Sequence, residues 1–468
     1  MTLEATRRAA TDVIEVRDPE DGSLVGTVPK AGRDEIEAVL RAAVEGARVS
    51  RSMPVHERMT VLRTAADLVA ERAEAFAETI AREGIKTIRE ARREVARCVE
   101  TLRLSAEEAR RVHGETIAFD QRPGSEDRVG YWIREPVGVI AAITPFNDPL
   151  NLVAHKVGPA IASGNAIVVK PHSATPLSAI ALAEAFRDAG LAPAVLQVVT
   201  GRGEEIGDAI VSDQRVAMVS FTGGPAVGDR LVARAGRKKL ALELGANSPN
   251  LVLRDADLDA AADAIADGAF GAAGQNCLHV QRIIVERPVV GALTEALVVR
   301  ARRVRRGRKL DETTDMGPLI NRAAAERVRA VIADASLRGG TVVAGGAGEG
   351  TWVEPTLVAD TPRDSRLARE EVFGPVAGLF PVDSLDEAID LANAAEQALH
   401  AAVFTSDLRS AMRVVREVAA GGVIVNDSSD YRIDAMPFGG VKASGLGREG
   451  VAHAITEMTT TKVVCLNL

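Results

Sequence analysis

The stretch GVIAAITPFNDPLNLVAHKVGPAIASGNAIVVK, residues 138–170, carries the pattern that decides the fold. Two runs rich in β-branched residues, 138–144 and 166–170, flank a segment with helical spacing of its apolar residues. The alternation continues with an expected helix over 176–190 and expected strands at 195–200 and 216–221. Strands that alternate with helices predict an α/β fold in which a parallel sheet is covered on both faces.

The pattern changes on both sides of this stretch. Residues 33–84 space apolar side chains three and four apart, which is typical of amphipathic helices, and a second strand–helix alternation runs from about residue 246 to about 442. Residues 116–136 predict a hairpin with a Pro-Gly-Ser turn, and residues 459–468 predict a terminal strand with no neighbouring strand in the sequence. Because the unpaired backbone groups of such strand edges are most readily hydrogen-bonded by another subunit, we expect a homodimer or homotetramer.

Composition bounds the class of protein. A chain of 468 residues allows two or three domains, and its 46% apolar and 26% charged residues exclude a disordered or disulfide-stapled chain. The net charge of −8 argues against a general nucleic-acid binder. Three scattered cysteines indicate reduced thiols. The sequence has neither a membrane-length apolar run nor a secretory signal at its start. We therefore expect a cytoplasmic protein that binds neither nucleic acid nor membranes.

Three positions suggest chemistry from residue type alone. The segment VSFTGGPAVGDRLVARAG, residues 219–236, predicts a strand, a glycine turn and a helix whose N-terminus could bind a phosphate, although glycines also serve such turns for steric reasons. Lys170 ends a strand at the sheet edge where α/β proteins bind ligands, or is simply an exposed lysine. Cys277 follows a glycine-rich turn. A lone cysteine is usually a small core residue, but polar neighbours do not suit a core.

These pieces belong to a longer ordered series of motifs. The series runs TPFND with Asn147, VVKP with Lys170, FTGG (221–224), ELGANSP with Glu243, GQNC with Cys277, DMGPLI (315–320), EEVFGPV (370–376), GGVIVND (421–427) and PFGGVKASGLGREG (437–450). Over nearly the whole chain it resembles the aldehyde dehydrogenase superfamily. It is most similar to the branch with phosphonoacetaldehyde, lactaldehyde and non-phosphorylating glyceraldehyde-3-phosphate dehydrogenases.

The resemblance implies a fold and a domain plan. A Rossmann-type cofactor domain would occupy residues 1–113 and 137–245, and an α/β catalytic domain would occupy 246–442. A small β oligomerisation flap would be formed by 114–136 and 443–468.

The resemblance also implies a covalent mechanism. Cys277 would attack the aldehyde, and the Asn147 amide with the backbone N–H of Cys277 would stabilise the oxyanion. After hydride transfer, Glu243 would act as general base in hydrolysis of the thioester. Branches that pass the acyl group to coenzyme A generally lack this glutamate, so its presence predicts a free carboxylic acid as product.

The implied cofactor is NADP or NAD, and no metal is expected. Lys170 resembles the lysine that binds the adenosine ribose. Ser173 stands where NAD-preferring members often carry a glutamate that repels a 2′-phosphate, so NADP should be accepted and NAD remains usable. Glu371 and Phe373 resemble the pair that holds the nicotinamide ribose and ring. The remaining cofactor contacts implied are Ile143, Thr144, Phe146, Gly223, Gly224 and Leu244.

The substrate is less sharply indicated. Arg97, His155 and Arg432 surround the expected pocket, with Asn276 beside the nucleophile, and they suit a compact anion. Each could instead be a surface arginine or a core histidine. We predict a short aldehyde that bears a phosphonate or phosphate, with lactaldehyde or succinate semialdehyde as the alternative. A non-catalytic member of the fold is the remote alternative, which the intact set of Cys277, Glu243 and Asn147 disfavours.

Overall fold

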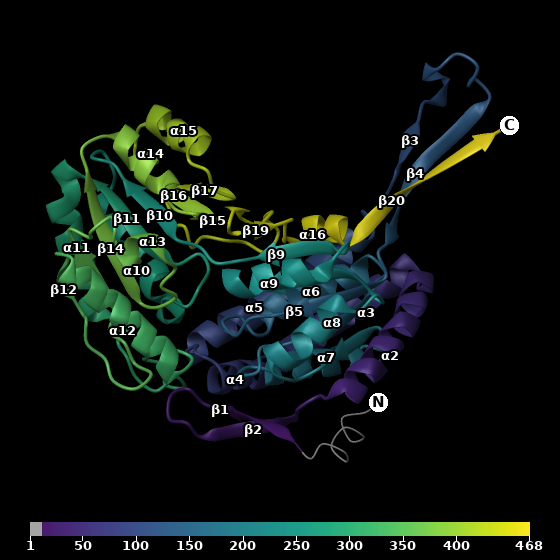
Figure 1. Ribbon diagram of the computed structural model, residues 1–468, viewed down its shortest axis with the longest axis horizontal. Coiled ribbons are helices and arrows are strands. Elements are labelled where there is room, and N and C mark those ends of the chain that lie inside the picture. Colours follow the sequence, from purple (N-terminus) through teal and green to yellow (C-terminus); the bar gives the residue numbers. More distant parts are fainter. Residues whose placement is uncertain (1–11) are drawn as a thin grey trace.

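The computed structural model describes residues 12–468, so residues 1–11 of the predicted cofactor domain lie outside the described chain. The chain forms two α/β lobes and a projecting β arm (Figure 1). A hairpin of β1 (Val13–Arg17) and β2 (Leu24–Pro29) precedes the first lobe.

The first lobe is built on a six-stranded sheet in the order β19-β9-β8-β5-β6-β7. Its five parallel strands are β5 (Val139–Ile143), β6 (Ala166–Lys170), β7 (Leu196–Val198), β8 (Val216–Thr222) and β9 (Lys239–Glu243). The short β19 (Gly445–Leu446) pairs antiparallel with β9. The parallel sheet predicted from residues 138–221 is therefore confirmed.

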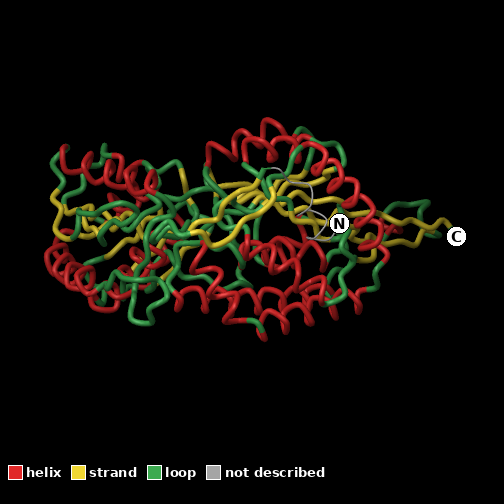
Figure 2. Tube along the Cα trace, turned by 90° about the horizontal axis from the view of Figure 1, so that it is seen from below, coloured by secondary structure: helices red, strands yellow, loops and turns green. Residues whose placement is uncertain are grey.

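Helices cover both faces of this sheet (Figure 2). They are α2 (Arg33–Ser52), α3 (Val55–Glu71), α4 (Ala73–Glu83), α5 (Ile88–Ala109), α6 (Asn151–Ala162), α7 (Leu177–Asp188), α8 (Asp208–Ser212) and α9 (Pro225–Ala235). Ile140 packs in one core with α3–α7, and its neighbour Ala141 packs in a second core with α2. Successive residues of a strand point to opposite faces, so both faces of the sheet are buried.

The second lobe holds a seven-stranded sheet in the order β12-β13-β14-β11-β10-β16-β17. The strands are β10 (Ser248–Val252), β11 (Val280–Glu286), β12 (Thr341–Ala344), β13 (Thr356–Ala359), β14 (Val376–Val382), β16 (His400–Phe404) and β17 (Gly422–Val425). The helices are α10 (Leu258–Phe270), α11 (Val290–Arg303), α12 (Arg322–Leu337), α13 (Arg366–Arg369), α14 (Leu385–Asn393) and α15 (Leu408–Glu417). The edge strand β12 runs antiparallel to β13, and a separate small sheet joins β15 (Gln397–Ala398) to β18 (Val441–Lys442).

The arm corrects one expectation. The terminal strand β20 (Thr459–Asn467) pairs antiparallel with β4 (Arg128–Pro136) along its whole length, and β4 also pairs with β3 (Glu115–Ile117). The strand therefore finds its partner within its own chain, because α16 (Val451–Glu457) packs on α6 and returns the chain to the base of the hairpin. The predicted oligomerisation segment 443–468 is thereby divided, since β19 and α16 lie on the first lobe and only β20 reaches the arm. Within residues 12–468, no helix is both long and apolar enough to span a membrane.

Candidate active site

A cavity of about 490 Å³ lies at the carboxyl ends of strands in the six-stranded sheet. It is where βαβ units commonly bind ligands, because loops from several strands meet there. Its lining brings together the predicted catalytic residues Asn147, Glu243 and Cys277. It also includes all the predicted cofactor residues, which are Ile143, Thr144, Phe146, Lys170, Ser173, Gly223, Gly224, Leu244, Glu371 and Phe373.

The nucleophile candidate follows a turn of unusual backbone conformation. Ala272 and Ala273 have φ angles of 49° and 53°, a left-handed conformation that non-glycine residues adopt at an energetic cost. At Gly274 a Cβ atom would lie 2.1 Å from the carbonyl oxygen of Gly374, so only glycine fits there. Gln275 anchors the end of the turn, since its amide accepts a hydrogen bond from the backbone N–H of Ile320 at 2.9 Å. The sequence immediately before Cys277 is thus held in one conformation by the surrounding structure.

The pKa of the Cys277 thiol depends on burial and on the charged residues around it. Burial raises the pKa of the thiol to about 12, and the guanidinium of Arg432 is the strongest opposing influence. Burial, reinforced by the nearby Glu449 carboxylate, also raises the pKa of Glu243 well above its usual range. The Oε2 atom of Glu243 is buried with no hydrogen-bond partner among the described residues. A carboxylate of raised basicity beside a protonated thiol is suited to accept protons.

A buried ion pair that the sequence reasoning missed lies behind Glu243. Lys156 Nζ donates to Glu449 Oε1 at 2.8 Å and to Ser220 Oγ at 3.0 Å, and both charged side chains are almost fully buried. Burial alone would raise the pKa of Glu449, but Lys156 and Arg432 outweigh it and lower that pKa to about 2. Glu449 lies in the GLGREG motif already noted, whereas nothing local distinguishes Lys156.

Two of the predicted substrate residues, Arg97 and His155, contact one carboxylate, and a third, Arg432, lies beside His155. Asp434, which the sequence reasoning missed, accepts from Arg97 Nη2 at 2.9 Å and lies 2.9 Å from His155 Nε2. Arg432 Nη2 lies 3.5 Å from the same His155 nitrogen. The Arg432 side chain is buried, with only 7% of it exposed. The guanidinium lies 3.7 Å from the ring centroid of Phe438, and this cation–π contact draws it inward.

These substrate candidates do not line the 490 Å³ cavity, whereas Cys277 does. Phe438 packs with Leu278 and Leu399 in a cluster that Cys277 joins, so Phe438 places Arg432 near the thiol. Asn276 donates its amide hydrogen to Asp430, directly beside the nucleophile.

The cavity presents polar groups that suit a dinucleotide. Lys170 Nζ bonds only to the neighbouring carbonyl of Pro171 at 3.0 Å among the described residues, and burial lowers its pKa to about 8. Thr144 Oγ1 is buried with no partner anywhere in the described chain. Helix α9 begins at Pro225 after Gly224, which supplies no side-chain cap, and the N–H of Val227 already bonds to the Gly224 carbonyl, so in this first turn the N–H of Ala226 is the group open to an anion.

The far end of the cavity suits a ribose and a ring. Glu371 accepts from the backbone N–H of Ala246 at 3.0 Å, and burial raises its pKa to about 7. The rings of Phe373 and Phe146 meet edge to face at 5.7 Å, with Phe373 at a φ of 50°. His172 and Arg327 also line the cavity, and the sequence reasoning missed both. Together these groups match the hydroxyls, phosphates and flat rings of NAD(P).

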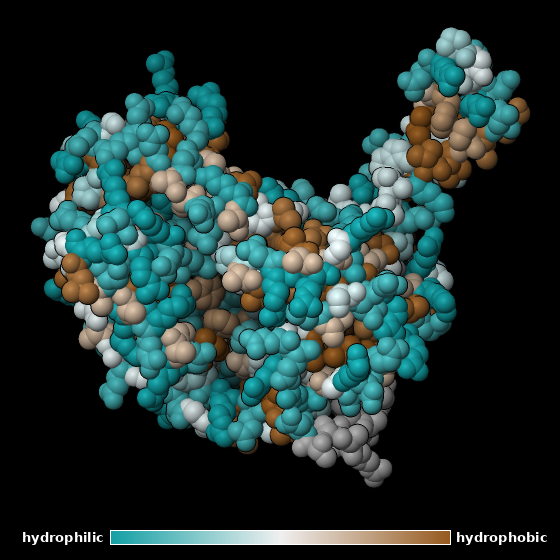
Figure 3. Space-filling view, in the orientation of Figure 1, coloured by the Kyte–Doolittle hydropathy of each residue, from teal (hydrophilic) through white to brown (hydrophobic). Residues whose placement is uncertain are grey.

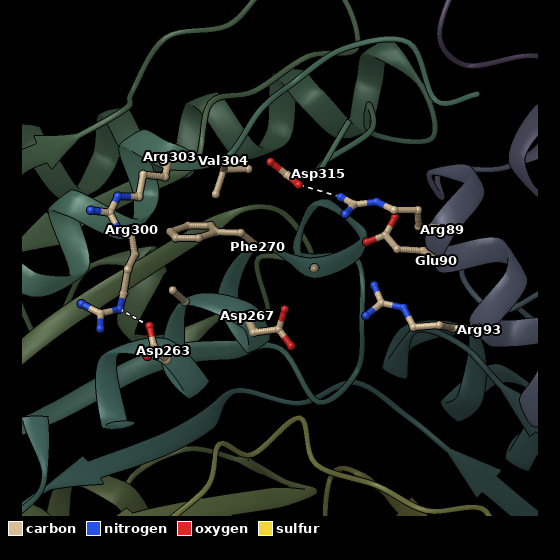
Figure 4. Close-up of a pocket in the computed structure, with 12 residues that line it drawn as sticks. Arg89, Glu90, Arg93, Asp263, Asp267, Phe270, Arg300, Arg303, Val304 and Asp315 are labelled. Atoms are coloured by element: carbon tan, nitrogen blue, oxygen red, sulfur yellow. Dashed lines mark hydrogen bonds and ion pairs between the residues drawn. The ribbon is translucent and has the colours of Figure 1, made fainter. Parts of the chain in front are cut away.

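A second cavity of about 610 Å³ lies between α5 and the α10–α11 pair (Figure 4). Four of its charged side chains form two pairs, since Arg89 donates to Asp315 at 2.6 Å and Arg300 to Asp263 at 2.5 Å. Within residues 12–468, no group of three or more His, Cys, Asp or Glu side chains could hold a metal ion.

Comparison with known proteins decides the family. The family model described as "Aldehyde dehydrogenase family" matches residues 6–464 of this chain. The chain belongs to the aldehyde dehydrogenase family. It is 48% identical over 455 residues to aspartate-semialdehyde dehydrogenase 1 of Pseudomonas canavaninivorans, covering 97% of each chain. It is also 44% identical over 438 residues to 3-sulfolactaldehyde dehydrogenase of Priestia megaterium, covering 94% of this chain and 91% of the relative.

A solved structure confirms the aldehyde dehydrogenase fold. Glyceraldehyde-3-phosphate dehydrogenase from Methanocaldococcus jannaschii, complexed with NADP, superposes with a TM-score of 0.94 at 39% identity. The match covers 97% of this chain and 99% of that one. This aldehyde dehydrogenase is an NAD(P)-dependent oxidoreductase that oxidises an aldehyde, which sets aside the alternative of a non-catalytic member.

Proposed function

We propose that this aldehyde dehydrogenase converts a short anionic aldehyde to its carboxylic acid through a covalent adduct of Cys277. The observation that carries the proposal is the meeting of a thiol, a basic carboxylate and an amide at one cavity, with a buried guanidinium beside the thiol. The thiol and carboxylate supply covalent and acid–base chemistry, and the guanidinium supplies recognition of an anion.

The first step is addition of the thiol to the carbonyl carbon. Glu243, whose pKa is raised by burial, accepts the Cys277 proton as the C–S bond forms. The Asn147 amide and the backbone N–H of Cys277 donate to the resulting oxyanion. Loss of one such donor typically costs about 100- to 1000-fold in rate.

The oxidation step depends on how the chain positions its cofactor. Lys170 and Glu371 would hold the two riboses, and the helix α9 N-terminus would face the pyrophosphate. The bound nicotinamide ring supplies the hydride acceptor. Ser173 adds no negative charge beside the adenosine ribose, so we propose that NADP is accepted and that NAD is also used.

Release of product requires water at the thioester. Glu243 first passes the Cys277 proton to solvent, so that its carboxylate can take a proton from that water, and hydroxide replaces the Cys277 sulfur at the acyl carbon. The sulfur leaves with the electrons of the broken C–S bond, and the product is a free acid.

The substrate class rests on the anion-binding side chains and on relatives. The relatives named for aspartate semialdehyde and 3-sulfolactaldehyde carry names of short aldehydes with a carboxylate or a sulfonate. The phosphonate- or phosphate-bearing aldehyde predicted from the sequence is untested and is one member of the anionic panel below. Neutral lactaldehyde is the second candidate, supported by a 39% identical lactaldehyde dehydrogenase of Methanocaldococcus jannaschii. Succinate semialdehyde belongs to the anionic class.

The test is steady-state reduction of NAD and NADP with a panel of anionic and neutral aldehydes. We expect anionic members to exceed propanal and lactaldehyde in kcat/KM. Arg432→Ala should remove that advantage, by about tenfold or more for loss of a charged hydrogen-bonding partner. Equal kcat/KM for propanal and the anionic members in the unmodified enzyme would contradict the proposed substrate class.

We also propose that the arm joins copies of this chain. Val129 and Tyr131 of β4 and Leu466 of β20 share one face of the arm, by alternation and register, and are 55%, 43% and 49% exposed. Apolar side chains gather on the arm in Figure 3. An exposed apolar sheet face of this kind suits burial against a second copy. A cytoplasmic location stays a prediction that rests on the free cysteines.

A further inference from the structure

Of the cations Arg97, Lys156 and Arg432 on the substrate side of Cys277, the first two are already matched by carboxylates. Arg97 Nη2 lies 2.9 Å from Asp434 Oδ1, and Lys156 Nζ lies 2.8 Å from Glu449 Oε1. Each of these pairs is close enough for a charge-assisted hydrogen bond, so neither cation has its full charge available to a ligand.

The neighbouring groups add no further positive charge. Burial first, and then Arg432, lower the pKa of His155, which keeps the ring neutral near pH 7. The residue before the nucleophile, Asn276, is neutral and donates to Asp430. Asp430 has its pKa raised to about 7 by burial and by Asp267, so it contributes partial negative charge.

Arg432 is the exception. Its nearest carboxylate oxygen, Glu449 Oε2, lies 3.7 Å away, beyond hydrogen-bond distance. Its Nε is buried and has no hydrogen-bond partner in the part of the chain that the structure describes. A buried donor without a partner is costly, and an anionic group on the substrate would satisfy it.

We propose that this subsite accepts a singly charged group, a sulfonate or a carboxylate, and rejects the dianion of a phosphonate or phosphate, with Asp434 as the specificity-determining residue. The inference rests on the proposed function, because it refines the anion at the same site. Arg432 can balance one negative charge. A second charge would be buried without a counter-ion, beside the carboxylates of Asp434 and Glu449.

Asp434 sets this limit because it holds both Arg97 and His155. Asn151 Nδ2 donates to the same Oδ1 atom at 3.1 Å. Removing the charge of Asp434 while keeping its size would leave Arg97 with only the more distant carboxylate of Asp148, 3.6 Å from Nη1, so more of the guanidinium charge would be available to a ligand. The subsite would then offer two cations to a dianion.

The first experiment compares sulfoacetaldehyde with phosphonoacetaldehyde in the unmodified enzyme. The two aldehydes have the same chain length and differ in charge at alkaline pH. We expect kcat/KM for the sulfonate to exceed that for the phosphonate by about tenfold or more, as like-charge juxtaposition costs several kcal/mol. The ratio of kcat/KM for sulfoacetaldehyde to that for phosphonoacetaldehyde should fall as the pH is lowered toward about 6. A phosphate-type dianion takes up a proton there, and Asp430 loses its charge over the same range.

The second experiment uses Asp434→Asn at one alkaline pH. We expect the ratio of kcat/KM for sulfoacetaldehyde to that for phosphonoacetaldehyde to fall by about tenfold or more, which is the size of effect typical of a buried charge. The matched control is Asp390→Asn, the same substitution at an exposed position of α14, which should leave the ratio unchanged. If Asp434→Asn does not fold, the pH series of the unmodified enzyme still decides whether the subsite prefers a singly charged group.

The outcomes separate this inference from the proposed function. A lead of phosphonoacetaldehyde over sulfoacetaldehyde at alkaline pH would overturn the monoanion inference and leave the anionic substrate class standing. An unchanged ratio in folded Asp434→Asn would overturn the role of Asp434. If propanal matched both anionic aldehydes, the proposed substrate class itself would fail.

Discussion

Glu90 Oε1 accepts a hydrogen bond from the backbone N–H of Ala272 at 2.7 Å, across 182 residues of sequence. The other oxygen of the same carboxylate accepts from the backbone N–H and the hydroxyl of Thr87, which completes the N-terminal cap of α5. One carboxylate thus joins the start of a helix in the first lobe to the left-handed turn that leads to Cys277.

The same face of α5 holds two further loops. Glu94 Oε1 accepts from the backbone N–H groups of Leu150 at 2.8 Å and Asn151 at 3.0 Å, just after Asn147. Arg97 binds Asp434 in the loop that carries Arg432. Residues spaced four and three apart lie on one side of a helix, so α5 aligns the three loops that meet at the site.

Glu90→Ala should impair the nucleophile more than it impairs folding. The turn at Ala272 loses the acceptor that fixes it, and a displacement of about 1 Å can cost about 100-fold in rate. We expect kcat and the rate of Cys277 alkylation by iodoacetamide to fall by about 10- to 100-fold. Glu90→Gln should recover part of this loss, since it retains an oxygen for Ala272.

Thr87→Val is the matched control for that change. It weakens the same helix cap, at a cost of about 1 kcal/mol in unfolding free energy, and leaves the bond to Ala272 in place. Cys277 alkylation should therefore stay near that of the unmodified enzyme. Equal losses of alkylation in Glu90→Ala and Thr87→Val would show that Glu90 acts through general stability alone.

Ser173→Glu should shift cofactor use from NADP toward NAD. A carboxylate at this position would repel a 2′-phosphate and accept hydrogen bonds from ribose hydroxyls. We expect the ratio of kcat/KM for NADP to that for NAD to fall by about tenfold or more. The neutral variant Ser173→Gln separates charge from size, and a similar shift in that variant would exclude charge repulsion as the cause.

Glu243→Gln should stabilise the fold increasingly as pH rises. The pKa of Glu243 is raised in the folded protein, so the native state holds this proton more tightly than the unfolded chain. The protonated Glu243 side chain stabilises the fold at low pH. This contribution is lost as the pH rises from the pKa of Glu243 in the unfolded chain through its higher pKa in the folded protein. Glutamine does not titrate, so its gain in Tm over glutamate should be larger at pH 8 than at pH 5.

The comparison for Glu243 is Glu100→Gln, at an exposed position of α5. It makes the same substitution on the surface, so a pH dependence of Tm that is found only in Glu243→Gln belongs to the buried site. A pH-independent gain for Glu243→Gln would show that Glu243 keeps an ordinary pKa in the folded enzyme.

Arg432→Met should make Cys277 less reactive at a given pH. The guanidinium lowers the pKa of a thiol that burial raises, so its loss leaves less thiolate. Methionine retains apolar contact with Phe438. We expect the pH profile of iodoacetamide alkylation to move to higher pH, and an unchanged profile would remove Arg432 from the electrostatics of the nucleophile.

Tyr131→Asp should weaken assembly through the arm. It places a charge on the apolar face shared by Val129 and Leu466, and burial of an unpaired charge is costly. Light scattering should then show a smaller species at the same concentration. If the mass is unchanged, this face does not form the interface.

The sequence by itself determined the order of strands and helices and the residues that gather at one sheet edge. Lys170 and Glu243 end β6 and β9, and Asn147 and Gly223 follow β5 and β8 closely. Parallel strands joined by helices bring their carboxyl ends to the same edge, so local pattern placed Lys170 and the glycine turn there, and the family resemblance added Asn147 and Glu243. The polar neighbours of Cys277 already marked this residue as unusual, and the family resemblance supplied its role as nucleophile.

Only the tertiary structure decided which charges are matched. His155 meets Asp434 across 279 residues and Lys156 meets Glu449 across 293 residues, and both pairs are buried. Any of these side chains could stand on a surface with the same local sequence, because burial and pairing depend on distant segments that fold against one another. The free donor of Arg432, the terminal strand of the arm and the Glu90–Ala272 bond follow from the same long-range packing.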